Sequence, residues 1–392
     1  MAFSTKFWDV ASACMALESL ALYNVSLQHY DIVSLWQVCL NLKKLVLADV
    51  ILPFAPFPES LRHKPLRRMR SLVMDVVLLP TDYETEWFKL FPNLRTIGWR
   101  EREEQPLSIE KLLPAIATAT RTATVTTTAV IDAGFVGGSG GGLWRNLKSL
   151  NIDIRSDDHL AAVLDSIDSL NKLEIAASYC SLKTLDSLIR RHQFTITSLK
   201  FDRCQHVTSA MTQTILSKFP ALEELVVPVL VAHDVSVGDP WICTQLKTLS
   251  TRIILTEFQD PTKGLSDDEY LLLPKDQEDL YARLSTLKRL VYLDIALSYA
   301  LPGTSNARFL LLDLNHPGFL KMVASLRNLQ TLLLYMSQRL SLEVAKQLVK
   351  CASLSLTRVD GQFHTSDGIW ISVDDLLCKR DRSSLIISQV LP

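Results

Sequence analysis

A serine set among glycines has the spacing of a known catalytic motif. Residues 137–141, Gly-Gly-Ser-Gly-Gly, fit the G-x-S-x-G pattern, in which a sharp strand-to-helix turn exposes a nucleophilic serine. Such a serine also needs a histidine and an acid beside it, and the spacing of the eight histidines identifies no such set. The residues that follow, 143–150, begin a strand phrase instead of a helix. We therefore interpret 137–142 as a flexible loop, with hydrolase chemistry at Ser139 as the alternative.

The sequence contains no motif that is typical of a metal-binding or cofactor-binding site. The histidines never have His-x-x-x-His spacing, and the seven cysteines never form a C-x-x-C pair. We therefore predict no catalytic, cofactor-binding or metal-binding residues. Scattered cysteines in an odd number are typical of a reducing compartment, so we expect the protein in the cytoplasm, the nucleus or both.

An acidic segment lies within residues 255–286. Ser266 and Glu269 have the spacing of a capping box, which favours a helix start at this point. The carboxylates that follow lack the central glycine and the closing glutamate of a calcium-binding EF-hand loop. We interpret the segment as a short helix on the edge of the fold, with a docking element as the alternative.

A basic segment, RHKPLRRMR, occupies residues 62–70. Leu66 and Met69 interrupt the cations, which favours a solvated face with these two side chains turned inward. The alternatives are a nuclear localisation signal or a contact with an anionic partner.

The overall composition gives no reason to expect a nucleic acid or a membrane as partner. The chain has 41 basic and 42 acidic residues and a formal net charge of −1. No apolar run approaches the roughly 20 residues that a membrane-spanning helix needs. We expect a monomer that binds another protein.

One phrase returns throughout the chain: apolar, two spacers, apolar, one spacer, apolar. Its first four copies open at Leu17, Leu42, Met69 and Leu94, at intervals of 25, 27 and 25 residues. This period and phrase are typical of a leucine-rich repeat, in which each copy forms one short strand and one helix. Further copies open at Leu147, Leu170, Ile196, Leu222, Leu246, Leu290, Leu329 and Leu356, and a degenerate copy is expected at Thr122, Val125 and Thr127.

The predicted fold is an α/β solenoid, a leucine-rich repeat horseshoe with about 12–13 strand–helix repeats and parallel strands on the concave face. Because the repeats run nearly from end to end, we expect a single domain over residues 1–392. An uncapped solenoid would expose its core, so both ends should carry caps. The expected parts are an N-terminal cap at 1–16, repeats at 17–363 with insertions near 130–143, 255–286 and 299–316, and a C-terminal cap at 364–392.

The spacer residues of each phrase should form the concave face, because strand side chains alternate between the two faces of a sheet. The resulting surface mixes both charge signs with tyrosines, which fits a protein partner held by a few aromatic and charged anchors. The predicted partner-binding residues are Tyr23, Asp75, Arg100, Asp153, Lys200, Asp202, Arg252, Tyr292, Asp294 and Tyr335.

These phrases also carry a family resemblance. The segment 199–204, Leu-Lys-Phe-Asp-Arg-Cys, resembles the ribonuclease-inhibitor-like, cysteine-containing class of leucine-rich repeat. The segments 7–14, 17–25 and 290–295 are similar to the repeat regions of fungal F-box/leucine-rich repeat proteins. That resemblance implies a substrate receptor of a ubiquitin ligase, with an adaptor and a cullin as further partners. The Leu-Pro opening of an F-box is not found before the first repeat at Leu17. A stand-alone leucine-rich repeat adaptor or structural protein without a ubiquitin role is the alternative.

Overall fold

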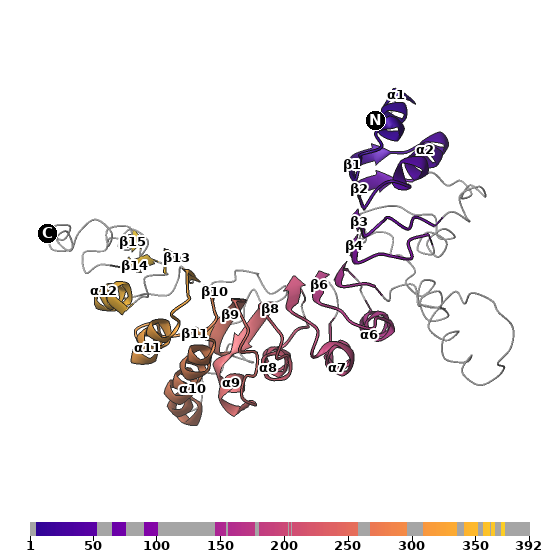
Figure 1. Ribbon diagram of the computed structural model, residues 1–392. Helices are drawn as coiled ribbons and strands as arrows, with labels where there is room; N and C mark the ends of the chain where they lie inside the picture. Colours follow the sequence, from indigo (N-terminus) through magenta and orange to yellow (C-terminus); the bar gives the residue numbers. More distant parts are fainter. Residues whose placement is uncertain are drawn as a thin grey trace, which may run out of the picture. The chain divides into compact units, whose positions relative to one another are not determined.

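The chain folds into two compact units, Met1–Thr195 and Ile196–Pro392. In each of them, the described helices lie to one side of the strands (Figure 1). No helix in the described part of the chain is long and apolar enough to cross a membrane. The computed structural model describes residues 5–52, 65–75, 90–100, 146–153, 156–176, 180–202, 204, 206–257, 267–295, 309–334, 341–351, 356–360, 362–364 and 370–372.

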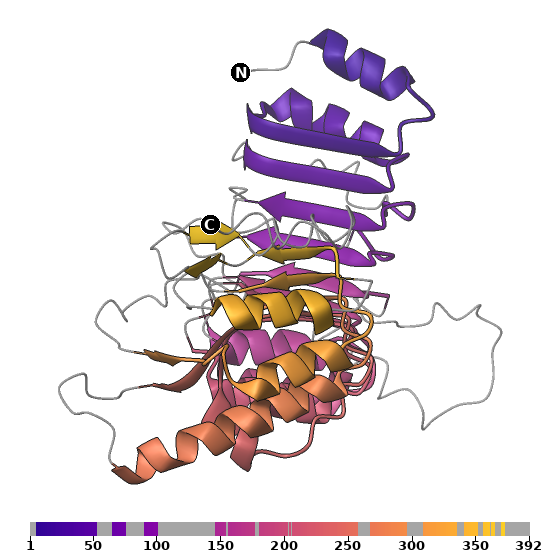
Figure 2. The same cartoon turned by 90° about the vertical axis from the view of Figure 1, so that its left-hand side faces the viewer.

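The first unit is a parallel sheet in which each strand pairs with the next one in the sequence. Strands β1 to β4 lie edge to edge in Figure 2, with α1 beyond β1. The elements are α1 (Thr5–Ala13), β1 (Ser19–Ser26), α2 (His29–Cys39), β2 (Lys44–Ile51), β3 (Ser71–Asp75), β4 (Thr96–Arg100), β5 (Ser149–Ile152), α6 (Asp157–Ser166), β6 (Lys172–Ala176) and α7 (Leu182–His192).

The second unit repeats this plan and adds short antiparallel pairings. Strand β11 pairs antiparallel with β9, and β14 pairs antiparallel with β15. The elements are β7 (Ser198–Asp202), α8 (Ser209–Lys218), β8 (Glu224–Val231), α9 (Ala232–Val237), β9 (Thr248–Glu257), α10 (Asp267–Thr286), β10 (Tyr292–Asp294), β11 (Phe309–Leu311), α11 (Pro317–Ser325), β12 (Thr331–Leu333), α12 (Leu342–Cys351), β13 (Arg358–Asp360), β14 (Gln362–His364) and β15 (Trp370–Ser372).

The repeat phrase determines where the strands begin. Every parallel strand starts two residues after the apolar residue that opens its phrase, from Leu17 and Ser19 to Leu356 and Arg358. The apolar positions of the phrase are the core: Leu42, Leu45 and Leu47 are fully buried. The predicted leucine-rich repeat fold with parallel strands is confirmed, and the described residues form twelve parallel strands.

The degenerate copy predicted at Thr122, Val125 and Thr127 lies outside the described residues. Strand β4 pairs directly with β5, with Thr96 opposite Ser149 and Ile97 opposite Leu150. No strand can therefore lie between them. The insertion near 130–143, with Ser139, and the cap region beyond Ser372 lie outside the described residues.

The insertions of the second unit contain regular structure. The short edge helix predicted in 255–286 is instead the 20-residue helix α10, which packs between α9 and α11 in the helical layer. The helix tolerates Pro274 in its interior, close to its middle. The insertion predicted near 299–316 contributes β11 and the N-cap residue of α11, His316.

Several helices begin at residues that cap them. Ser156, Ser181 and Thr208 precede α6, α7 and α8, and each hydroxyl accepts a hydrogen bond from a backbone N–H in the first turn. Near the N-terminus, the buried carboxylate of Asp31 accepts bonds from Trp8 Nε1 (2.6 Å) and the Gln28 N–H (2.7 Å). The Trp8 contact joins α1 to α2.

A histidine, His192, is buried in the core of the first unit. The fully buried His192 holds neighbouring repeats together, with Nε2 3.0 Å from the Leu164 carbonyl and Nδ1 accepting the Leu170 N–H at 3.3 Å. This pattern requires the neutral ring protonated at Nε2. Burial lowers the pKa of His192 from its usual 6.5, since the charged ring loses its hydration.

We predict that the stability contributed by neutral His192 is present above pH 6.5 and is lost as the pH falls below it. In that range the unfolded chain binds a proton that the folded chain excludes, so the loss from this one group reaches at most about 1.4 kcal/mol per pH unit. Urea unfolding curves between pH 7.5 and 5 measure it. His192→Gln keeps one donor and one acceptor, and should have a smaller pH dependence. An unchanged pH dependence in that variant would contradict the prediction.

Candidate partner-binding face

The strands of each unit present one face that the helices do not cover, here called the open face. Its side chains are the spacer residues of the repeat phrase, as the sequence predicted. In the first unit, the register aligns them in rows across the strands. One row runs through Ser19, Lys44, Ser71, Thr96, Ser149 and Lys172, and the next through Ala21, Val46, Val73, Gly98, Asn151 and Glu174.

The predicted anchors of the first unit lie on this face or at its end. Tyr23 is 60% exposed on β1, the first strand. Asp75, half-buried at the end of β3, is opposite Arg100 in the register of β3 and β4. Asp153 directly follows β5 and is half-buried. The side chain of Arg100 lies outside the described residues.

In the middle of this open face, Gly98 lies beside Val73. A Cβ atom on Gly98 would lie 3.2 Å from Val73 Cγ1, so the glycine leaves room for the neighbouring valine. The next residue in the row, Asn151, has a buried side-chain oxygen with no hydrogen-bond partner among the described residues. This part of the face therefore changes from apolar to polar within one strand spacing.

In the second unit, neighbouring strands hold their open-face side chains by direct bonds. Glu224 on β8 accepts a hydrogen bond from Ser198 Oγ (2.7 Å) and pairs with Lys200 Nζ (2.7 Å). Both partners are on β7, so one carboxylate orients two side chains of the adjacent repeat. The sequence analysis named Lys200 as a partner-binding residue but did not name Glu224. The available signal was that Glu224 occupies a spacer position of the next repeat phrase.

A second polar contact lies around β10. Ser250 Oγ donates to Asp294 Oδ2 (2.8 Å), and Asp294 is only 9% exposed. Burial and the charge of Asp294 raise the pKa of Tyr292, while the charge of Arg358 acts against them. The half-buried Tyr292 hydroxyl therefore stays protonated as a donor near neutral pH. Asp294, one of the predicted partner-binding residues, is mostly buried and accepts the hydrogen bond of Ser250.

Three more of the predicted partner-binding residues remain, and the structure describes two of them. Asp202 at the end of β7 and Arg252 on β9 are both half-buried. Arg252 is opposite Val229 of β8. Tyr335 lies outside the described residues.

One cluster in the helical layer contains the residue types of a hydrolase. Asp276 on α10 accepts Ser236 Oγ at 2.5 Å and lies 3.0 Å from His233 Nδ1. In a hydrolase the histidine contacts the serine, whereas here the acid contacts both. The arrangement joins α9 to α10 and does not place His233 as the base of the serine. Within the described ranges, no group of three or more His, Cys, Asp or Glu side chains is placed to hold a metal ion.

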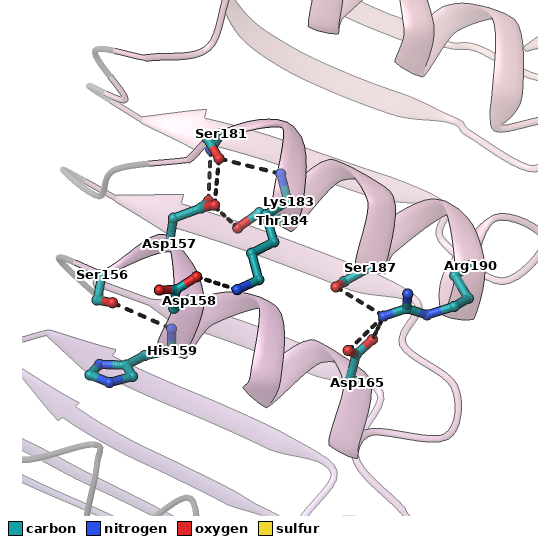
Figure 3. A network of polar contacts seen from close by, with 10 residues as sticks. All are labelled: Ser156, Asp157, Asp158, His159, Asp165, Ser181, Lys183, Thr184, Ser187 and Arg190. Atoms are coloured by element: carbon teal, nitrogen blue, oxygen red, sulfur yellow. Dashed lines mark hydrogen bonds and ion pairs between the residues drawn. The ribbon is translucent and has the colours of Figure 1, made fainter.

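The helical layer of the first unit pairs its charges within itself. Figure 3 shows α6 and α7 joined by Asp158 with Lys183 and by Asp165 with Arg190. Asp157 also accepts bonds from the Ser181 N–H (2.7 Å) and Thr184 Oγ1 (2.5 Å). Exposed pairs of this kind contribute little stability, but they leave these cations already partnered.

Comparison with known proteins finds a likeness of fold alone. No family model matches the sequence, and no curated protein matches it. Among solved structures, a leucine-rich repeat-containing protein, LegL7 from Legionella pneumophila, is 14% identical with a TM-score of 0.36, over 84% of this chain and 96% of that one. A structure of the complex of Rad7 and Elc1 in yeast is 13% identical with a TM-score of 0.40, over 90% of this chain and 72% of that one.

Proposed function

We propose that this chain is a recognition scaffold that binds a protein partner on the open face of its parallel strands. The observation that carries the proposal is the open face of the second unit, where Glu224 orients Ser198 and Lys200, and Ser250 bonds to Asp294. Side chains fixed in this way lose little conformational freedom when a partner binds. Tyr292 adds a half-buried aromatic ring with a protonated hydroxyl, the kind of residue that dominates protein interfaces.

The proposal predicts that Tyr292→Ala lowers partner binding by roughly thirtyfold or more, since a central aromatic anchor is worth about 2 kcal/mol or more. Crosslinked affinity purification from the source cells, followed by mass spectrometry, identifies the partner, and the purified pair then gives the dissociation constant. Tyr30→Ala is the matched control, because Tyr30 is an exposed tyrosine on α2 in the helical layer. Equal binding by wild type and Tyr292→Ala would contradict the proposal.

A substrate receptor of a ubiquitin ligase is the more specific form of this function. It rests on the similarity of segments 7–14, 17–25 and 290–295 to fungal F-box/leucine-rich repeat proteins. The same purification tests it: a cullin and an adaptor should appear beside one enriched protein. If the enriched protein appears without them, the chain acts as a stand-alone adaptor.

A further inference from the structure

The entry ends of the strands in the first unit form a continuous column of backbone hydrogen bonds. The residue before each strand donates its N–H to the carbonyl of the corresponding residue one repeat earlier. These bonds run from Lys43 to Glu18 (2.8 Å), Arg70 to Lys43 (2.8 Å), Arg95 to Arg70 (2.7 Å), Lys148 to Arg95 (2.8 Å) and Asn171 to Lys148 (2.9 Å). These bonds place residues that are far apart in the sequence side by side, separated by the distance between adjacent strands.

Most of the side chains on this column and on the first open-face row are cations or small hydroxyl residues. We call Lys43, Lys44, Arg70, Arg95, Lys148 and Lys172 the basic ladder. All six are exposed except Arg70, which is half-buried. The one acid in the two rows is Glu18, which pairs with Lys43 at the first strand. The ladder is therefore a strip of one charge sign on a chain whose net charge is −1.

The other five cations of the ladder have no acidic partner in the part of the chain that the structure describes. Arg70 donates to the Asn93 carbonyl (3.2 Å), and Lys148 donates to Ser169. Neither contact neutralises a charge. This contrasts with α6 and α7 of the same unit, where Lys183 and Arg190 are paired with aspartates.

The second unit shows that the repeat does not require cations at these positions. Its equivalent column is Thr197, Glu223, Lys247, Val291, Gln330 and Thr357, joined by bonds of the same kind. There the single lysine is paired, with Lys247 Nζ 2.8 Å from Glu223 Oε2. The charge of the basic ladder is thus specific to the first unit and is not a consequence of the fold.

We propose that the basic ladder binds an acidic, extended segment of a protein partner, through residues other than the anchors of the proposed function. Strands about 4.8 Å apart place Lys43 and Lys148 about 14 Å apart across four strands. In an extended peptide, neighbouring side chains on the same face are about 6.8 Å apart. Three carboxylates on one face therefore span about 14 Å. The two rows contain no aromatic side chain on which a nucleic acid base could stack, which favours a peptide.

The test measures fluorescence anisotropy of a labelled ten-residue oligoglutamate peptide with the full chain. We expect saturable binding that weakens as salt is raised from 50 to 500 mM, because exposed charges are screened. The triple variant K44E/R95E/K148E should bind the peptide roughly tenfold or more weakly, since three attractions become repulsions. These three side chains are exposed, and circular dichroism checks that the fold is kept.

The control variant K275E/K321E/K350E changes the net charge equally but alters exposed lysines of the second unit. It should retain peptide affinity within about twofold, as should Tyr292→Ala. An equal loss in both triple variants, or no binding by wild type, would overturn the proposal. So would tighter, ladder-dependent binding of a ten-nucleotide single-stranded DNA than of the peptide. A third outcome separates the two proposals. If the wild type binds the peptide as expected, but Tyr292→Ala binds the protein partner as tightly as the wild type does, only the open-face function is contradicted.

Discussion

Replacing Phe201 with alanine is expected to lower the free energy of unfolding by about 3–5 kcal/mol. Phe201 fills the third apolar position of its repeat phrase on β7 and has no exposed surface. Its removal loses the burial of an aromatic ring and leaves a cavity that the close-packed strands and helices close only in part. Denaturation in urea, followed by circular dichroism, measures the change.

The matched control for this prediction is Phe194→Ala. Phe194 lies two residues after the end of α7 and is 74% exposed, so its truncation should change stability by less than about 0.5 kcal/mol. If the two alanine variants unfolded at the same urea concentration, the assignment of the third apolar position to the core would be refuted.

The strands could be predicted from the sequence because their signal is local and periodic. Each phrase places three apolar residues at spacings that only a strand entering a shared core can bury together, as Leu42, Leu45 and Leu47 do. The same regularity does not decide residues 101–148. There, a long interval suggested an extra copy, and β4 pairs directly with β5. Interval length alone cannot distinguish a strand in the sheet from a loop outside it.

The helix α10 was underestimated for a related reason. The capping-box spacing of Ser266 and Glu269 suggested a short helix, but the second half of α10 contains Leu280, Tyr281 and Leu284, all buried. Gln277 and Tyr281 donate to the Asp313 carbonyl at 2.7 and 3.1 Å. These tertiary contacts outweigh the weak local helix signal, and no pattern in the segment alone reveals them.

The sequence predicts which positions lie on the open face, but it does not predict the burial or the hydrogen-bond partners of each side chain there. Alternation along a strand identifies Lys200 and Asp294 as open-face residues. It does not show that Lys200 pairs with Glu224 or that Asp294 is buried against Ser250. Such contacts depend on which side chains neighbouring repeats place opposite each other and on how closely those side chains pack. The basic ladder was missed for the same reason, since its residues become neighbours only when the repeats stack.

A loop of the second unit is held by one buried glutamine. Gln213 on α8 is 6% exposed, donates Nε2 to the Asp239 carbonyl at 2.7 Å and accepts Trp241 Nε1 at 2.6 Å. A Cβ atom at Gly238 would lie 2.4 Å from Nε2 and 2.6 Å from Cγ of this side chain. The backbone of Gly238, with φ −83° and ψ 168°, suits any residue, so the obstacle to a side chain at this position is Gln213 itself.

Gly238→Ala and Gln213→Ala should therefore destabilise the protein singly but not additively. We expect Gly238→Ala to cost about 1–3 kcal/mol through overpacking. Gln213→Ala should cost a similar amount, about 1–3 kcal/mol, because Trp241 Nε1 and the Asp239 carbonyl lose their partner. In the double variant the new methyl group occupies space that the glutamine has left, so the combined loss should be smaller than the sum by about 0.5–3 kcal/mol. Urea denaturation of all four proteins closes the cycle. Strict additivity would mean that the loop moves away from α8 when Gly238 gains a side chain, and that Gln213 does not fix its position.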